Sequence, residues 1–237
     1  MTSSTHRAHQ GKRRHGLSRY RNITQYIALL TPAEAATFMA LAQKSDYTTY
    51  HSAVCEQTLA DMLQIDVSTV RRHIARMGSA RLVRHHTETL PGGHRKNHYQ
   101  LATRHYCRID VERLLSMHLP LRHKGFATQL KTMCHNATNQ CLLPATEIAR
   151  HLGMARHTAE TYLHDLCQTG LLMRTERGYE LTRTDIFDPG QLSAEERLRL
   201  FFPPPEAGRY ATRALKDHVQ LNQSLIPAHP DRGIYIM

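Results

Sequence analysis

The stretch TLADMLQIDVSTVRRHIARM, residues 58–77, decides the fold of this chain. It carries two apolar patterns with helical spacing, separated by a short polar break. The first pattern predicts a helix over about residues 55–63, and the second predicts a helix over about residues 67–78. Residues 64–65 form the predicted turn, and Asp66 is expected to accept amide hydrogen bonds at the start of the second helix. The stretch therefore predicts two helices joined by a tight turn.

The second predicted helix has two chemically different faces. At about 3.6 residues per turn, its apolar face comprises Val70, Ile74 and Met77. Its outer face comprises Ser68, Arg71, Arg72, Ala75 and Arg76. Arg72 and Arg76 lie one turn apart, and both suit guanine edges in a DNA major groove because Arg can bond bidentately to guanine. Arg71 flanks this pair and better suits phosphate, as do the hydroxyls of Ser68 and Thr69 at the helix start.

A β-hairpin is predicted after the helix pair. Residues 81–86 favour a strand, Pro91-Gly92-Gly93 breaks it, and residues 98–101 alternate apolar and polar side chains as a returning strand would. The loop between the strands is expected to carry three basic side chains at its tip: His94, Arg95 and Lys96. Between residues 71 and 108 the chain has nine Lys or Arg and one acid, so a strongly basic surface is expected here.

The helix pair and the hairpin together resemble the winged helix-turn-helix family of bacterial DNA-binding proteins, in the form common in plasmid replication initiators and related regulators. The positions that carry the resemblance are Leu59-Ala60, Ile65, Asp66, Ser68-Thr69-Val70, Leu82-Val83 and residues 92–99 (GGHRKNHY). Gln64 and Arg81 replace the glycines usual at two turn positions, but both can adopt a left-handed backbone at modest strain. The resemblance implies sequence-specific binding of double-stranded DNA, with the second helix in the major groove and the basic hairpin, or wing, beside it.

The same pattern occurs again later in the chain. Corresponding residues are 89 positions apart: Leu59 and Ile148, Leu63 and Leu152, Leu82 and Leu171. Gly153 and Gly170 occupy the two turn positions, and residues 171–181 predict a second, shorter hairpin. A leading helix is expected over residues 125–135. Because no gap is needed to align the two segments, the sequence predicts two tandem units.

The two predicted recognition helices differ in charge. The outer face of the second helix carries His157, Glu160, Thr161, His164 and Asp165 where the first carries three Arg. Carboxylates facing a phosphate lattice are unfavourable, so the first unit is expected to be the main DNA reader. The second unit is expected either to contact DNA more weakly, through Arg156, His157 and Thr161, or to pair with another subunit.

The predicted fold class is α+β: mainly helical, with small β-hairpin wings, in two tandem winged helix-turn-helix units. The expected organisation is a basic flexible arm (1–22), a first winged helix domain (23–108), a linker helix (109–122), a second winged helix domain (123–184) and a helical or irregular tail (185–237). In the arm, Arg13 and Arg14 are candidate DNA contacts. A short strand is expected over residues 23–30, before a helix that starts with Thr31, Pro32 and Glu34.

The composition favours a polyanionic partner in a reducing compartment. The chain has 237 residues, with 31 Lys plus Arg against 20 Asp plus Glu and a formal net charge of +11, which favours nucleic acid. No apolar run is long enough to span a bilayer and no signal segment opens the chain, so we expect a cytoplasmic protein with no membrane partner. The five Cys are isolated and odd in number, which fits reduced thiols.

The sequence offers little support for enzymatic chemistry. It has no Gly-rich phosphate loop and no H-x-H pair with a nearby catalytic Tyr, so we expect no enzyme and no cofactor. Cys134, His135 and Cys141 lack the second ligand pair of a zinc site, so no metal is expected. Three functions stay open: a replication initiator or replication-control protein of a plasmid or mobile element, a homodimeric transcriptional regulator at an operator, and an interaction module tethered to DNA. The last would recruit a protein partner through the second unit or the tail.

Overall fold

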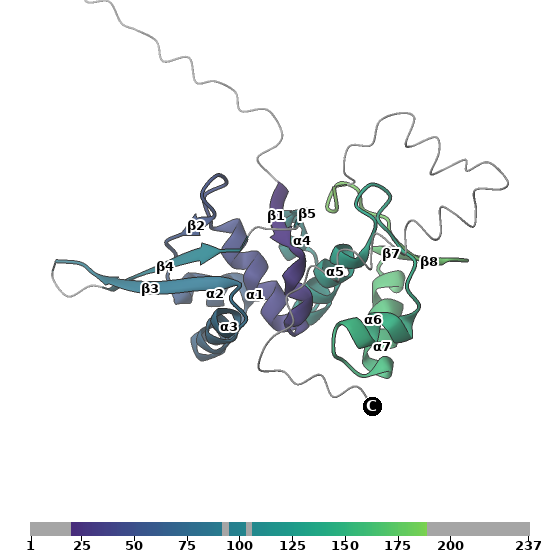
Figure 1. Ribbon diagram of the computed structural model, residues 1–237, viewed down its shortest axis with the longest axis horizontal. Coiled ribbons are helices and arrows are strands. Elements are labelled where there is room, and N and C mark those ends of the chain that lie inside the picture. Colours follow the sequence, from purple (N-terminus) through teal and green to yellow (C-terminus); the bar gives the residue numbers. More distant parts are fainter. Residues whose placement is uncertain (1–19, 92–94, 103–105, 189–237) are drawn as a thin grey trace, which may run out of the picture.

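The computed structural model describes residues 20–91, 95–102 and 106–188, and of Arg95 only the backbone (Figure 1). The first half contains β1 (Tyr20–Thr24), the 3-10 helix η1 (Gln25–Leu29), α1 (Pro32–Gln43), β2 (His51–Ser52), α2 (Glu56–Leu63), α3 (Val67–Ser79), β3 (Val83–Thr89) and β4 (Arg95–Leu101). The second half contains β5 (Tyr106–Asp110), α4 (Val111–Ser116), α5 (Leu121–Met133), β6 (Gln140–Cys141), α6 (Ala145–His151), α7 (Arg156–Gln168), β7 (Leu172–Thr175) and β8 (Gly178–Leu181). The strands form three small antiparallel sheets, in the orders β1-β5, β2-β4-β3 and β6-β8-β7. The fold is mixed α+β, as the sequence predicts.

The backbone repeats almost element for element. Helices α1, α2 and α3 begin 89 positions before α5, α6 and α7, and β3 begins 89 positions before β7. We call α1 to β4 the first unit and α5 to β8 the second unit. The left-handed turn residues also repeat, since Gln64 (φ 54°) corresponds to Gly153 (φ 59°) and Arg81 (φ 57°) to Gly170 (φ 70°). Gln64 and Arg81 therefore adopt the left-handed backbone expected of them, without the freedom of glycine.

The helix pair of the first unit buries the predicted apolar face. Val70 and Met77 are fully buried between α3 and the rest of the unit. Sequence reasoning missed His73, which is buried on the same side with its Nδ1 2.7 Å from the Thr37 hydroxyl. The expected side-chain cap at Asp66 is wrong, because that exposed carboxylate makes no cap hydrogen bond and only its backbone carbonyl accepts from the helix. Water can serve the free amides at this exposed helix start.

The hairpin of the first unit is longer and more regular than expected. Its strands pair from Val83 and Leu101 at the base to Thr89 and Arg95 near the turn, and it projects from the body (Figure 1). Arg95 and Lys96, expected at the loop tip, are instead part of β4, because strand pairing continues as far as Arg95. The second hairpin is nine residues shorter, since its base pair Leu172–Leu181 spans nine positions against eighteen for Val83–Leu101.

The chain before α1 also differs from expectation. Strand β1 pairs with β5, and η1 follows it in place of the strand expected over residues 23–30. The Thr24 hydroxyl accepts a hydrogen bond from the Tyr26 amide (3.4 Å), which favours a turn over continued extension. Arg21, assigned to the flexible arm, instead donates from its guanidinium to the Ser45 carbonyl (3.1 Å). The last residues of the expected arm therefore belong to the folded body.

Helix α1 begins as predicted, with a capping box. The Thr31 hydroxyl accepts from the Glu34 amide (3.4 Å), and the Glu34 carboxylate accepts from the Thr31 amide (2.8 Å). Residues 35–42 are all buried, because α2 and α3 pack against one part of this helix and α5 packs against another. Helix α1 is thus the central helix of the described fold.

The segment between the units contains more than the expected linker helix. Strand β5 reaches Asp110, α4 covers only Val111–Ser116, and α5 already begins at Leu121 instead of residue 125. Pro120, expected to end the linker helix, instead lies directly before α5. A backbone N–H at this position would have no hydrogen-bond partner within the helix, so proline loses nothing there. The linker expected over residues 109–122 is therefore shared among three elements.

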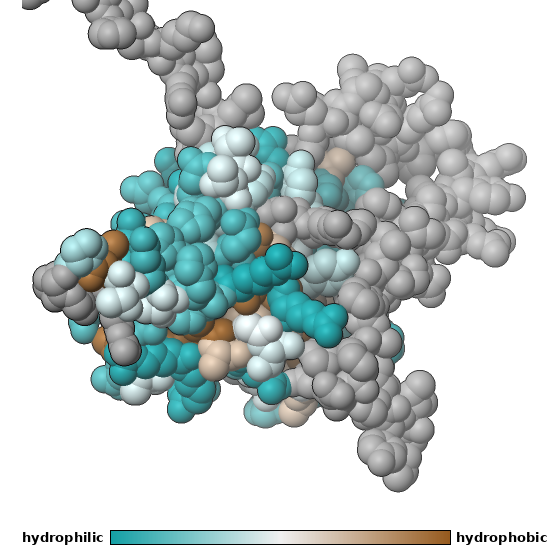
Figure 2. Space-filling model, turned by 60° about the vertical axis from the view of Figure 1, so that its left-hand side comes forward, coloured by the Kyte–Doolittle hydropathy of each residue, from teal (hydrophilic) through white to brown (hydrophobic). Residues whose placement is uncertain are grey.

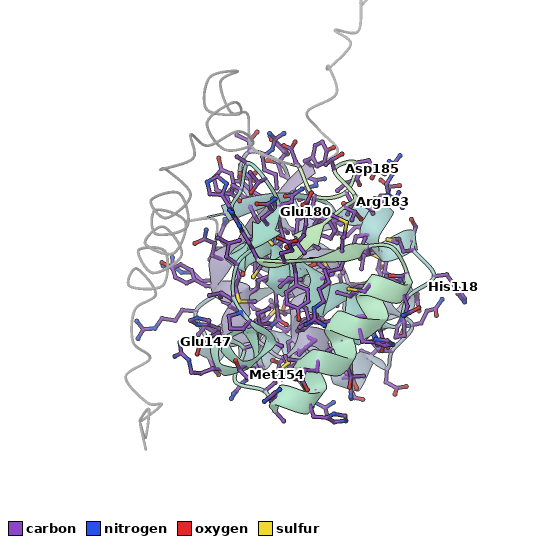
Figure 3. The ribbon with its side chains drawn as sticks, turned by 90° about the vertical axis from the view of Figure 1, so that its right-hand side faces the viewer. His118, Glu147, Met154, Glu180, Arg183 and Asp185 are labelled. Carbon is purple, nitrogen blue, oxygen red and sulfur yellow. The ribbon has the colours of Figure 1, made fainter. Side chains whose placement is uncertain are left out.

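The first residues of the expected tail pack against the body. Ile186 and Phe187 are fully buried, and the Asp110 amide donates to the Ile186 carbonyl (2.8 Å). Figure 3 shows Arg183 and Asp185 together at one end of this side of the molecule, where they form an ion pair of 2.8 Å. The chain after the second hairpin is thus tied to β5.

Equivalent helices of the two units pack against each other. Helices α1 and α5 lie side by side in the middle of the molecule (Figure 1). A Cβ added to Gly125 of α5 would lie 1.7 Å from the Pro32 carbonyl oxygen and 3.2 Å from the Ala36 nitrogen. The Thr128 hydroxyl lies 2.7 Å from the Met39 sulfur. Both Gly125 with Ala36 and Thr128 with Met39 are 89 positions apart, so equivalent positions of the two units meet where these helices pack.

Buried His73 predicts that the fold loses stability in mild acid. Burial lowers the pKa of His73 below its ordinary value of 6.5; the nearby Glu34 carboxylate opposes this shift, and Arg72 adds to it slightly. The folded protein then binds a proton at His73 less well than the unfolded chain does. The contribution of neutral His73 to stability is therefore fully present above pH 6.5, and it is lost as the pH falls through the folded pKa. We expect the urea midpoint to fall between about pH 7 and about pH 5, with a smaller fall in His73→Gln. Equal falls in both proteins would contradict this prediction.

Candidate nucleic-acid interface

The outer face of α3 is open to solvent. Ser68, Arg71, Arg72 and Arg76 are exposed, and Thr69 is half-buried. The opposite side of the helix packs against α1 and α2, which fixes its orientation on the body. Figure 2 shows that the surface at this end of the molecule is mostly hydrophilic, with small apolar patches. The sequence-predicted contacts of α3 therefore lie together on one accessible face.

Arg72 and Arg76 form a basic pair on this face. Of the three Arg on α3, only Arg71 makes a side-chain ion pair or hydrogen bond with another described residue. No described residue therefore uses the guanidinium donors of Arg72 and Arg76, which can serve a ligand. The pair lies one helical turn apart, and a helix about 10–12 Å wide fits a major groove about 12 Å wide. Both side chains could reach base edges in one groove.

Arg71 is held by an acid that sequence reasoning missed. Its Nε lies 2.6 Å from Oε2 of Glu56, and the side chains are 67% and 16% exposed, respectively. Glu56 is the first residue of α2, where a carboxylate also faces the positive end of the helix. The two residues are 15 positions apart on different helices, so helical periodicity alone could not reveal the contact. Arg71 keeps its terminal nitrogens, Nη1 and Nη2, for phosphate.

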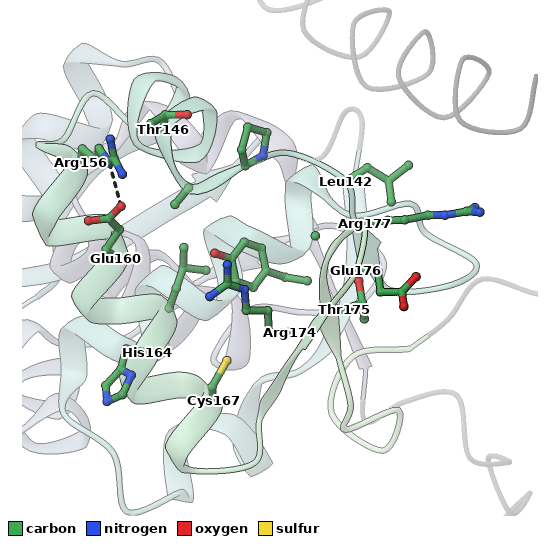
Figure 4. A pocket seen from close by; sticks show the side chains of 15 residues that line it. Leu142, Thr146, Arg156, Glu160, His164, Cys167, Arg174, Thr175, Glu176 and Arg177 are labelled. Atoms are coloured by element: carbon green, nitrogen blue, oxygen red, sulfur yellow. Dashed lines mark hydrogen bonds and ion pairs between the residues drawn. The ribbon is translucent and has the colours of Figure 1, made fainter. Parts of the chain in front are cut away.

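Each unit has a cleft between its third helix (α3 or α7) and its hairpin. The first cleft has a volume of about 380 Å³, and Glu56, Arg71 and His85 are among its lining residues. The second cleft, between α7 and the β7–β8 hairpin, is larger at about 780 Å³ (Figure 4). In the second unit, Ala145 and Glu160 occupy the positions of Glu56 and Arg71. The two clefts therefore have equivalent positions in the fold but are lined by residues of different charge at these two positions.

The hairpin of the first unit carries a chain of histidines that sequence reasoning missed. His98 Nδ1 lies 3.1 Å from His51 Nε2, and His98 Nε2 lies 2.9 Å from the Glu88 carboxylate. His86 stacks on His98 with ring centroids 4.8 Å apart. Three adjacent strands each supply one of these rings, because cross-strand neighbours share a face of the sheet. Lys96 is exposed on this hairpin and ends in solvent, as a phosphate contact requires.

The outer face of α7 is charge-neutralised. Arg156, a predicted DNA contact, forms an ion pair with Glu160 (Nε to Oε1, 2.7 Å; Figure 4). Asp165 lies 2.8 Å from the His123 Nε2 of α5. His157 and Thr161 are exposed, as predicted contacts must be, and the Thr161 hydroxyl donates to the carbonyl one turn earlier. Helix α7 thus has no Arg without an ion pair, whereas α3 has Arg72 and Arg76, which pair with no described residue.

Four predicted contacts have side chains outside the described residues. They are Arg13, Arg14, His94 and Arg95. Their roles stay predictions from the sequence.

Comparison with known proteins gives no match: no family model, no curated protein and no solved structure is similar to this chain. Among the described helices, none has the length and apolar character needed to cross a membrane. Within residues 20–91, 95–102 and 106–188, no three His, Cys, Asp or Glu are grouped as a metal site.

Proposed function

We propose that this protein binds double-stranded DNA in a sequence-specific manner, as a chain of two tandem winged helix-turn-helix units. In this proposal α3 enters the major groove, where Arg72 and Arg76 bond to guanine edges. The observation that carries the proposal is this Arg pair, which no described residue engages in an ion pair or side-chain hydrogen bond, on the exposed side of a helix whose other side is core. Arg156 is the one Arg of α7 and is paired with Glu160 on the same helix, so α7 offers no comparable Arg pair.

Phosphate contacts would flank the base contacts. Ser68 and Thr69 lie in the first turn of α3, where the Asp66 side chain leaves the helix amides uncapped. These amides, the two hydroxyls and the positive end of the helix dipole favour a phosphate oxygen. Arg71 on one side of the helix and Lys96 on the wing would complete the backbone contacts.

The second unit supports a replication initiator over a single-unit regulator. Two units in one chain, with a basic arm before them, suit an initiator that binds repeated origin sequences of a plasmid or mobile element. The alternatives are a dimeric regulator and an interaction module, and the neutralised face of α7 favours a protein partner in the latter. Footprinting separates them, because direct repeats favour the initiator and a palindrome favours the regulator. Co-purification of another protein through residues 120–237 would favour the module.

The salt dependence of binding tests the role of the wing. Lys96→Ala should weaken binding to all duplexes alike and reduce the slope of log K against log salt by about 0.9, because one phosphate contact is lost. Arg122→Ala removes another exposed charge, on α5, and is the control, expected to leave the slope unchanged. Gel shifts over a salt series would measure both. An unaltered slope in Lys96→Ala would remove the wing from the interface.

A further inference from the structure

Glu56 is an unexpected residue to find at a DNA interface. Its carboxylate lines the cleft between α3 and the hairpin, close to where phosphates would pass. A carboxylate in this position repels DNA, so its presence calls for a compensating role. Only 16% of its side chain is exposed, and one of its oxygens lies 2.6 Å from Arg71 Nε. The structure indicates that this role is to orient the guanidinium of Arg71.

The contact leaves Arg71 oriented and still able to bind an anion. A guanidinium is planar and has five N–H donors, of which Nε supplies one. With Nε engaged, Nη1 and Nη2 stay available and can donate side by side to one phosphate. Arg71 is 67% exposed, so these nitrogens are accessible to a ligand. An Arg fixed before binding loses less rotamer freedom when DNA arrives.

The repeat indicates that the acid and the Arg belong together. The second unit has Ala145 at the position of Glu56 and Glu160 at the position of Arg71. It therefore lacks both members of the pair, although its backbone is equivalent. The acid on α7 is instead paired with Arg156 on the same helix. The first-turn acid of α6, Glu147, lies two positions further along and pairs with Arg150 on the same helix. An acid at the first position of the second helix thus occurs only in the unit whose third helix carries an Arg opposite it.

We infer that Glu56 is a positioning residue for DNA binding: it holds Arg71 at the edge of the α3–β3 cleft so that Nη1 and Nη2 bind one backbone phosphate. The inference rests on the proposed function. It predicts that removing a negative charge from the interface weakens DNA binding, which is opposite to the effect of simple charge repulsion. This difference in sign makes the inference testable.

The test compares the affinity of Glu56→Ala and Glu56→Gln for one duplex selected by the wild-type protein. We expect Glu56→Ala to bind about threefold to tenfold more weakly. Glu56→Gln keeps an oxygen that can accept from Nε and should recover most of this loss. In an Arg71→Ala background, Glu56→Ala should instead strengthen binding, because only repulsion is removed. Thermal unfolding of each variant establishes that it is folded at the assay temperature.

A phosphate-level measurement separates positioning from a general structural role. Ethylation of individual phosphates should show one phosphate that wild type and Glu56→Gln require, and that Arg71→Ala and Glu56→Ala no longer require. Glu56→Ala that binds as tightly as wild type, Glu56→Gln that binds no better than Glu56→Ala, or an equal loss in both Arg71 backgrounds would overturn the inference. If these results occur while Arg72→Ala/Arg76→Ala abolishes specific binding, the proposed function stands. Failure of wild type to bind any duplex would overturn both.

Discussion

Gly125→Ala is expected to lower the free energy of unfolding by about 3 kcal/mol, the upper part of the usual range for overpacking. The added Cβ would lie 1.7 Å from the Pro32 carbonyl oxygen and 2.6 Å from its carbonyl carbon. These are backbone atoms at the start of α1, which the Thr31–Glu34 capping box holds in place. Neither helix can move away without disturbing the junction between the two units, so the loss of stability is large.

Gly78→Ala is the matched control for this prediction. Gly78 also lies in a helix, but the nearest atom to an added Cβ is the Val83 carbonyl oxygen at 3.8 Å. Because Ala favours a helix over Gly, this change should stabilise the protein by about 0.5–1 kcal/mol. Urea unfolding would give both values from the midpoints at constant m. Equal midpoints for the two variants would show that α1 and α5 are not in close contact.

Arg72→Ala/Arg76→Ala is expected to weaken binding to the selected duplex by about 4 kcal/mol, close to a thousandfold. Each Arg is expected to make one bidentate bond to guanine, worth about 1–3 kcal/mol against the wrong base. Binding to unrelated duplexes should fall much less, because backbone contacts supply most of that affinity. Fluorescence anisotropy on the selected and the unrelated duplex would measure the ratio of the two affinities.

Arg72→Lys/Arg76→Lys provides the control for charge. Lys keeps the positive charge but lacks the planar fork that matches guanine. This variant should retain the wild-type salt slope and its binding to unrelated duplexes, while it loses preference for the selected sequence. If it kept that preference, the pair would be acting as point charges and not as base readers.

Local patterns in the sequence predicted the elements that depend on local contacts. The helix pair and the capping box at Thr31 follow from residues a few positions apart, whereas the turn positions of Gln64 and Arg81 were expected from the resemblance to a known fold. The offset of 89 was readable for the same reason, since the second unit repeats these local signals. The exposed basic face of α3 follows from helical periodicity, which was sufficient to place Arg72 and Arg76.

Contacts between distant residues could not be predicted in this way. Strand β1 exists because it pairs with β5, whose residues lie more than eighty positions later. Lys131 is fully buried, where its ammonium donates to the Asn139 side chain and the Asp188 carbonyl, although a Lys on a helix is expected at the surface. The pair of Glu56 and Arg71 joins two helices. Each of these features depends on tertiary packing that the amino-acid pattern does not encode locally.

The most direct test of base reading by α3 is methylation interference at guanine N7, on a duplex selected from a random library. The N7 atom lies in the major groove and is one of the two atoms that Arg contacts on guanine. We predict that methylation of one or two guanines blocks binding of the wild-type protein, and that the same methyl groups have no effect on Arg72→Ala/Arg76→Ala. A selected duplex on which no guanine methylation interferes, or on which the same guanines interfere with both proteins, would contradict the account.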